Sequence, residues 1–112
     1  MKIAIPVNEG KLSMHFGHCD KFYLVTVDRP NKAILSEEFI IPPPHQPGIL
    51  PGWLAEQGAE CIIAGGMGGK AQQLFQKNNI SIITGAPAKD VKEIISEYLN
   101  NTLVTGDNTC DH

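Results

Sequence analysis

The sequence of 112 residues is long enough for one domain and leaves little room for a second hydrophobic core. Nine basic and twelve acidic residues give a formal net charge of −3, which argues against nucleic-acid binding because phosphate-binding surfaces carry a basic excess. No apolar run reaches the roughly 20 residues of a membrane span, and the N-terminus lacks the pattern of a secretory signal peptide. These features predict a cytoplasmic domain that binds neither nucleic acid nor membrane.

Strand patterns come first along the chain. Residues 3–7 alternate between larger and smaller apolar side chains, and Pro6 among them suggests an edge strand or a strand end. Residues 22–27 are β-branched or aromatic, and 33–41 follow a turn that contains Pro and Asn. An antiparallel meander of three strands is therefore expected.

Helices and strands alternate in the second half. Three stretches keep a helical period: 49–57, 71–75 and 91–99. Two short apolar runs are typical of buried parallel strands: 61–64 and 80–83. Gly58 is the predicted stop of the first helix. The order β-β-β-α-β-α-β-α predicts a three-layer α/β domain over residues 1–100, with a mixed sheet of about five strands, and a flexible tail over 101–112.

A glycine-rich loop, residues 65–69, lies between a predicted strand and a predicted helix. Its G-x-G-x-x-A spacing ends at Ala71 and is that of a dinucleotide fingerprint. However, the next strand ends without an acidic ribose partner, and Asp90 belongs to the start of the last predicted helix. Ala71 also stands where a phosphate loop needs Ser or Thr. Three interpretations stay open: a tight turn, a loop whose amides face another anion, and a nucleotide site.

Cysteine and histidine residues concentrate in two short segments. His15, His18 and Cys19 lie close together, and Cys110 and His112 end the chain. Imidazole and thiolate groups bind zinc, iron, copper and thiometallates. Because no C-x-x-C pair is present, we expect an open or ligand-recruited metal site rather than a zinc finger. The alternative is ordinary loop histidines that bond to backbone carbonyls.

Four other residues have two interpretations each. Cys61 lies in an apolar strand, where cysteine packs as a small hydrophobe more often than it acts as a ligand. Trp53 fits a core or interface better than a cofactor site. His45 either lines a cleft or is exposed. Met67 either lines a cluster pocket or fills the core.

Cys19 could form a nucleophile–base pair with His15 or His18, but no orienting third group accompanies them. No two-metal carboxylate set is present either, so we expect a protein that is not an enzyme.

Six spaced motifs follow one another along the chain: Ile3-Ala4-Ile5-Pro6-Val7, His15-Phe16-Gly17, Phe22-Tyr23-Leu24-Val25, Gly48-Ile49-Leu50-Pro51-Gly52-Trp53-Leu54, Ile63-Ala64-Gly65-Gly66-Met67-Gly68 and Gly85-Ala86. Together they resemble the dinitrogenase iron–molybdenum cofactor biosynthesis family. The resemblance implies a ribonuclease H-like fold without nuclease activity, in small accessory proteins that bind or carry metal–sulfur clusters or their precursors. One such relative, the orange protein, holds a mixed molybdenum–copper sulfide cluster.

The resemblance also implies a set of site residues. Seven positions match the family's two loop motifs: His15, Phe16, Gly17, Gly65, Gly66, Met67 and Gly68. His18, Cys19, Cys110 and His112 are less general in the family and are expected as additional metal ligands, with His45 beside the cluster. The cluster's metal, whether iron, molybdenum or copper, is left open, as is the oligomeric state.

The function expected from these observations is a non-catalytic carrier of a metal–sulfur cluster or its precursor, working with other cluster-assembly proteins. One alternative is a thiol redox-sensing or protein-interaction module that uses Cys19 and Cys110. Another is a nucleotide-binding regulator that uses the glycine loop.

Overall fold

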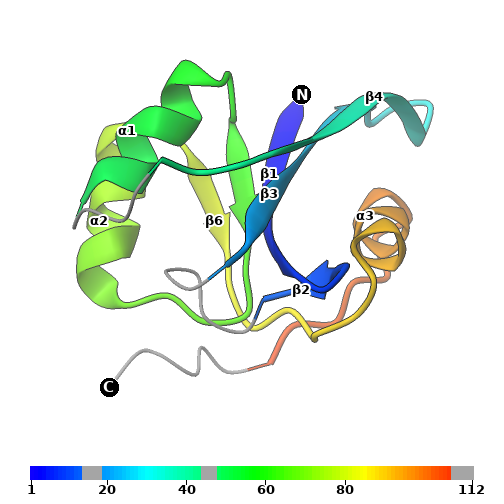
Figure 1. Ribbon diagram of the computed structural model, residues 1–112. Coiled ribbons are helices and arrows are strands. Elements are labelled where there is room, and N and C mark those ends of the chain that lie inside the picture. The colour runs from blue at the N-terminus through cyan, green and yellow to red at the C-terminus, as the bar shows by residue number, and fades with distance from the viewer. Residues whose placement is uncertain (14–18, 44–47, 107–112) are drawn as a thin grey trace.

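Six strands form a mixed sheet in the computed structural model, which describes residues 1–13, 19–43 and 48–106 (Figure 1). The strands are β1 (Lys2–Asn8), β2 (Lys11–Leu12), β3 (Lys21–Asp28), β4 (Ala33–Ile40), β5 (Cys61–Ile63) and β6 (Ser81–Ile83). The helices are α1 (Ile49–Glu56), α2 (Gly69–Lys77) and α3 (Val91–Leu99). The sheet order is β4-β3-β1-β5-β6, and β2 pairs with the end of β1. Helices α1 and α2 cover one face and α3 the other, which confirms the three-layer α/β prediction.

Strand directions agree with the sequence patterns. β1, β3 and β4 form an antiparallel meander, and β5 is parallel to both β1 and β6. The structure contains one strand that was not predicted, β2, because its two residues are too few to show an alternating pattern. The Leu12 N–H of β2 donates to the Lys89 carbonyl at 2.9 Å, so this short strand joins the end of β1 to the start of α3.

Pro6 occupies the central strand, and the expectation of an edge or a strand end is wrong. It pairs with Phe22 on the β3 side of β1. On the other side, β5 pairs with residues 3–4 and β2 with residues 7–8, so Pro6 lies between two partners. Its carbonyl accepts a hydrogen bond on that side from the Ser13 N–H at 2.7 Å. A proline is tolerated there because no neighbouring strand needs its missing N–H.

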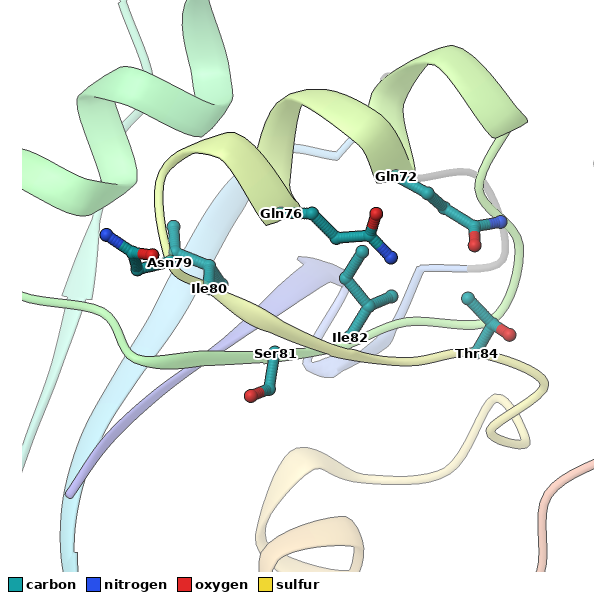
Figure 2. Close-up of a pocket in the computed structure, with 7 residues that line it drawn as sticks. All are labelled: Gln72, Gln76, Asn79, Ile80, Ser81, Ile82 and Thr84. Carbon is teal, nitrogen blue, oxygen red and sulfur yellow. The ribbon is translucent and has the colours of Figure 1, made fainter.

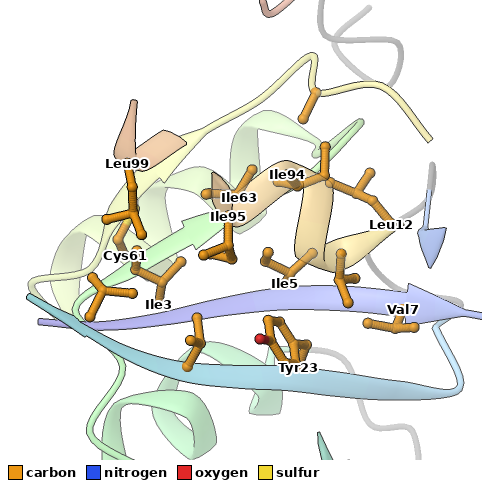
Figure 3. Close-up of a cluster of buried hydrophobic side chains, with 14 residues drawn as sticks. Ile3, Ile5, Val7, Leu12, Tyr23, Cys61, Ile63, Ile94, Ile95 and Leu99 are labelled. Atoms are coloured by element: carbon orange, nitrogen blue, oxygen red, sulfur yellow. The ribbon is translucent and has the colours of Figure 1, made fainter. Parts of the chain in front are cut away.

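One hydrophobic core, the α3-side core, lies between the sheet and α3 (Figure 3). Its buried members are Ile3, Ile5, Val7, Leu12, Tyr23, Val25, Val27, Cys61, Ile63, Ala86, Val91, Ile94, Ile95 and Leu99. The odd-numbered residues of β1 enter this core because successive side chains of a strand point to opposite faces. Ile94 and Ile95 of α3 cover them.

The opposite core, the α1/α2-side core, lies between the sheet and the other two helices. Its buried members are Ala4, Phe22, Leu24, Leu50, Leu54, Ala59, Ile62, Ala64, Met67, Phe75 and Ile80. Trp53 packs against this core, with its ring centroid 5.9 Å from that of Phe22, which confirms its interpretation as a packing residue. None of the helices that the structure describes combines the length and apolar character needed to cross a bilayer.

Each of the three helices that the structure describes is followed, two positions after its last residue, by a residue with positive φ. Gly58 (φ 91°), Asn79 (φ 61°) and Asn101 (φ 58°) each follow the last helical residues. In each case this residue and the next donate their N–H groups to carbonyls of the final turn, the bonding pattern of a Schellman motif. The predicted stop at Gly58 is confirmed.

A buried tyrosine links β3, β4 and α3. The Tyr23 hydroxyl donates to the Glu37 carboxylate, and Lys92 of α3 lies 3.4 Å from the same carboxylate. The hydrogen bond from Tyr23 lowers the pKa of Glu37, partial desolvation opposes it, and Lys92 adds to the lowering. Burial raises the pKa of the Tyr23 hydroxyl above its ordinary value. Tyr23, Glu37 and Lys92 thus connect β3 and β4 to α3.

This arrangement predicts how stability depends on pH. Because the folded-state pKa of Glu37 lies below its unfolded value, its contribution is present above the unfolded pKa and is lost as the pH falls through the folded pKa. Tyr23→Phe should therefore reduce the loss of stability between about pH 5 and pH 3, measured as the shift in urea midpoint. Tyr98→Phe is the control, because the Tyr98 hydroxyl faces the Met1 sulfur at 3.8 Å. Equal pH dependence in the wild type and Tyr23→Phe would contradict the prediction.

Candidate functional site

The carboxyl ends of the parallel strands meet at the lower edge of the sheet in Figure 1. The glycine loop follows β5 there, and residues 84–87 follow β6. Cys19 also belongs to this edge, because it precedes β3, which runs antiparallel to β1. Loops at this edge are where α/β sheets commonly bind ligands.

Two carbonyl groups of the glycine loop accept hydrogen bonds that hold the loop in place. The Gly65 carbonyl accepts from the Gly85 N–H at 2.8 Å, and the Met67 carbonyl accepts from the Gln72 side-chain amide at 3.0 Å. Gly68 then caps α2 without a side chain. A Cβ atom built on Gly68 or Gly69 would meet nothing within 4 Å. A side chain at Gly68 or Gly69 would therefore meet open space, so close packing does not explain glycine at these two positions.

Met67 and Asp90 each have an observed structural role. The Met67 side chain is 1% exposed and belongs to the α1/α2-side core, so it fills the core. Asp90 caps α3 by accepting from the Lys92 N–H at 2.9 Å, as expected of a residue at a helix start. The loop therefore lacks a ribose partner at Asp90, which weakens its interpretation as a nucleotide site.

The two described cysteines lie in different surroundings. Cys61 is buried in the α3-side core, as predicted for a small hydrophobe. Cys19 is half-buried and packs against the α1/α2-side core. Burial raises the pKa of the Cys19 thiol to about 11, although hydrogen bonds from the backbone at Cys19 and Val7 oppose the rise. Redox-sensing cysteines need thiolate character near neutral pH, so this raised pKa weakens the redox alternative.

Asn8, at the end of β1, anchors both ends of the segment that carries His15 and His18. Its Nδ2 donates to the Ser13 Oγ at 3.0 Å, and its Oδ1 accepts from the Asp20 N–H at 2.7 Å. Ser13 itself is buried. Sequence reasoning missed Asn8, although an asparagine directly after a buried strand is a signal of local side-chain bonding to the backbone.

Removing this anchor should destabilise the fold. Asn8→Ala leaves the Ser13 hydroxyl and the Asp20 N–H without these partners, so we expect the free energy of unfolding to fall by about 1–2 kcal/mol. Chemical denaturation measures the change. Asn31→Ala is the matched control, because Asn31 bonds to Asp28 in an exposed turn, and it should cost about 0.5 kcal/mol or less. Similar losses in both variants would show that Asn8 is no special anchor.

The C-terminal segment returns to the same edge. The Gly106 N–H donates to the Gly85 carbonyl at 2.7 Å, and the Gly85 N–H donates to the Gly65 carbonyl. Two backbone hydrogen bonds thus connect the glycine loop to the residue after which Cys110 and His112 follow. Cys110 is four residues beyond Gly106, within about 14 Å of it along an extended chain.

Most of the predicted site residues lie outside the described residues: the metal ligands His15, His18, Cys110 and His112, and the cofactor-binding residues Phe16, Gly17 and His45. Within 1–13, 19–43 and 48–106, no three His, Cys, Asp or Glu side chains come together as a metal site. The set of metal ligands therefore stays a prediction. The boundary between a domain over residues 1–100 and a tail over 101–112 also stays a prediction. The described residues contribute Cys19, the glycine start of α2 and the anchored starts of the two segments in which the other ligands are predicted.

A groove of about 550 Å³ runs between α2 and β6 (Figure 2). It is lined by Gln72, Gln76, Asn79, Ile80, Ser81, Ile82 and Thr84. These side chains offer amides, hydroxyls and apolar surface, and none of them is ionisable. Among the described residues, the groove therefore supplies no carboxylate, imidazole or thiolate, and it contains none of the residues predicted for the site.

Comparisons with known proteins identify a family for this chain. A family model described as dinitrogenase iron-molybdenum cofactor matches residues 1–101. The protein MJ0580 of Methanocaldococcus jannaschii is 33% identical over 107 residues, which cover 92% of this chain and 89% of that protein. The crystal structure of PH0822 has a TM-score of 0.87 and 25% identity, with 94% of each chain covered.

The apo form of the orange protein from Desulfovibrio gigas shares the fold, with a TM-score of 0.72 and 22% identity over 96% of this chain and 93% of that one. The sequence motifs, the three-layer sheet and the family match over nearly the whole chain lead to one conclusion. This chain belongs to the dinitrogenase iron-molybdenum cofactor family.

Proposed function

We propose that this protein is a non-catalytic accessory protein that binds a metal–sulfur cluster, or its precursor, as cargo at the carboxyl edge of the sheet. The observation that carries the proposal is that the Cys19 thiol, the start of α2 at Gly68 and Gly69, and the returning segment at Gly106 all belong to this edge. Family membership supports cargo that contains iron, molybdenum or both, and copper is a further component to test.

The donor set fits an anionic sulfide cluster. Amides at a helix N-terminus favour negative charge, and a thiol gives up its proton when it binds a metal. His15, His18, Cys110 and His112 would add ligands to Cys19, while the glycine loop would face the cluster's sulfides. With a formal charge of −3, the protein as a whole does not attract an anion, so these local groups would have to hold it.

Anaerobic reconstitution tests the proposal with two probes: tetrathiomolybdate plus Cu(I), and Fe(II) plus sulfide. Bound metal is measured after desalting, together with the visible absorption spectrum. The wild type should retain at least one probe, whereas Cys19→Ser and His15→Ala should each lose most of it. Cys61→Ala is the matched control, because it removes a thiol from the core. Unchanged metal content in both site variants would overturn the proposed site, and no binding by the wild type would overturn the function.

A further inference from the structure

One edge of the sheet is long, apolar at both ends and acidic in the middle. β4 has eight residues and pairs only with β3 among the strands that the structure describes. The opposite edge, β6, has three residues. Natural sheets usually keep exposed edges short or covered, because an unpaired edge is a template for another strand. β4 is therefore a long exposed edge of the sheet, although its register with β3 shifts opposite Thr26 and Val27.

Apolar side chains flank the acidic middle of β4. Leu35 is 64% exposed and Ile41, just beyond the strand, is 80% exposed, and Phe39 is about half exposed. Between them lie Glu37 and Glu38, which point to opposite faces because they are adjacent in the strand. Glu37 faces α3 through its contacts with Tyr23 and Lys92, so Glu38 lies on the face of α1.

The acidic pair disfavours a second copy of this chain as the occupant. An antiparallel pairing of two copies centred on Glu37 or Glu38 places that glutamate opposite the same glutamate of the other copy. Like charges opposed in this way are destabilising. A pairing centred on Ser36 would set Glu38, on the α1 face, against Ile34, which shares the α3 face with its partner Val27 because the register of β4 shifts at Leu35. A parallel, in-register pairing again places each glutamate beside its copy. Self-pairing is thus opposed in each register that uses most of the strand.

We propose that β4 is the docking edge for an extended strand of another protein, with two adjacent cationic residues flanked by β-branched apolar residues. Neighbouring cations on a strand face opposite sides, so one meets Glu38 on the α1 face and the other meets Glu37 on the α3 face. The apolar flanks then cover Leu35 and Phe39, and backbone hydrogen bonds extend the sheet beyond β4. This inference goes beyond cluster binding and does not depend on it.

The test uses the full chain without metal and a fluorescein-labelled peptide, Thr-Val-Thr-Ile-Lys-Arg-Ile-Thr-Val-Thr, followed by fluorescence anisotropy. We expect saturable binding, and roughly tenfold weaker binding of the peptide with Glu-Glu in place of Lys-Arg. Glu38→Lys in the protein should reverse the preference between the two peptides. Glu60→Lys is the control, because it changes the net charge equally at an exposed position outside β4.

Amide NMR spectra locate the peptide, and circular dichroism checks that each variant is folded. Shifts confined to β4 and β3 support the proposal. It is overturned by shifts at β6 instead, by equal weakening in Glu60→Lys, by no binding of the cationic peptide, or by a protein dimer in sedimentation that Leu35→Lys dissociates. Since metal is absent throughout, these outcomes are independent of the reconstitution experiment.

Discussion

Replacing Phe75 with alanine should lower the free energy of unfolding by about 3–5 kcal/mol, the cost of a large cavity in a packed core. The Phe75 side chain is fully buried and joins α2 to the α1/α2-side core. Because α2 begins directly after the glycine loop, loss of this anchor should also weaken the carboxyl edge of the sheet. Urea denaturation followed by circular dichroism measures the change.

Phe39→Ala is the matched control for this prediction. Phe39 is about half exposed on β4. The centroid of its ring lies 5.1 Å from that of the Tyr23 ring and 4.6 Å from the Lys21 ammonium. Its truncation opens no cavity, so we expect a cost of about 1 kcal/mol or less. If the two variants were equally destabilised, the assignment of Phe75 as the main anchor of α2 would be wrong.

Gly85→Ala should detach the C-terminal segment from the carboxyl edge of the sheet. A Cβ atom at this position would lie 2.0 Å from the Gly106 carbonyl oxygen, and φ is +80°. The clash and the strained φ together should cost about 1–3 kcal/mol, relieved by separation of the two segments. Amide hydrogen exchange at Gly106 should then become at least about tenfold faster, because its hydrogen bond to Gly85 is lost.

Gly10→Ala separates the clash from the backbone strain. Gly10 has a similar φ of +82°, but a Cβ atom there would meet nothing within 4 Å. We expect a cost of about 1 kcal/mol and unchanged exchange at Gly106. If Gly85→Ala also left the exchange of Gly106 unchanged, the proposed tie between the C-terminal segment and the glycine loop would fail.

The main elements were predictable because their signals are local. β3 is β-branched and aromatic, β5 is a short apolar run, and Gly58 ends α1, all as their residue types indicate. Asn79 and Asn101 end their helices in the same way but were not identified, because asparagine adopts positive φ less distinctively than glycine.

The site was less predictable because its supports are contacts between distant segments. Pro6 in the central strand depends on two other strands leaving a gap beside it. The Gly85–Gly106 approach joins residues that no periodic pattern relates. Composition drew attention to Cys19 and the glycine loop, whereas the role of Asn8 depends on hydrogen bonds across a loop.

The two hydrogen bonds of Asn8 have a thermodynamic consequence for cargo binding. Bringing the ends of a short loop together costs conformational entropy, on the order of 1–2 kcal/mol for a connection of this length. Here Ser13 and Asp20 are held to β1 by the folded protein itself. That entropy is therefore lost during folding, and the affinity for the proposed cargo would not have to overcome it.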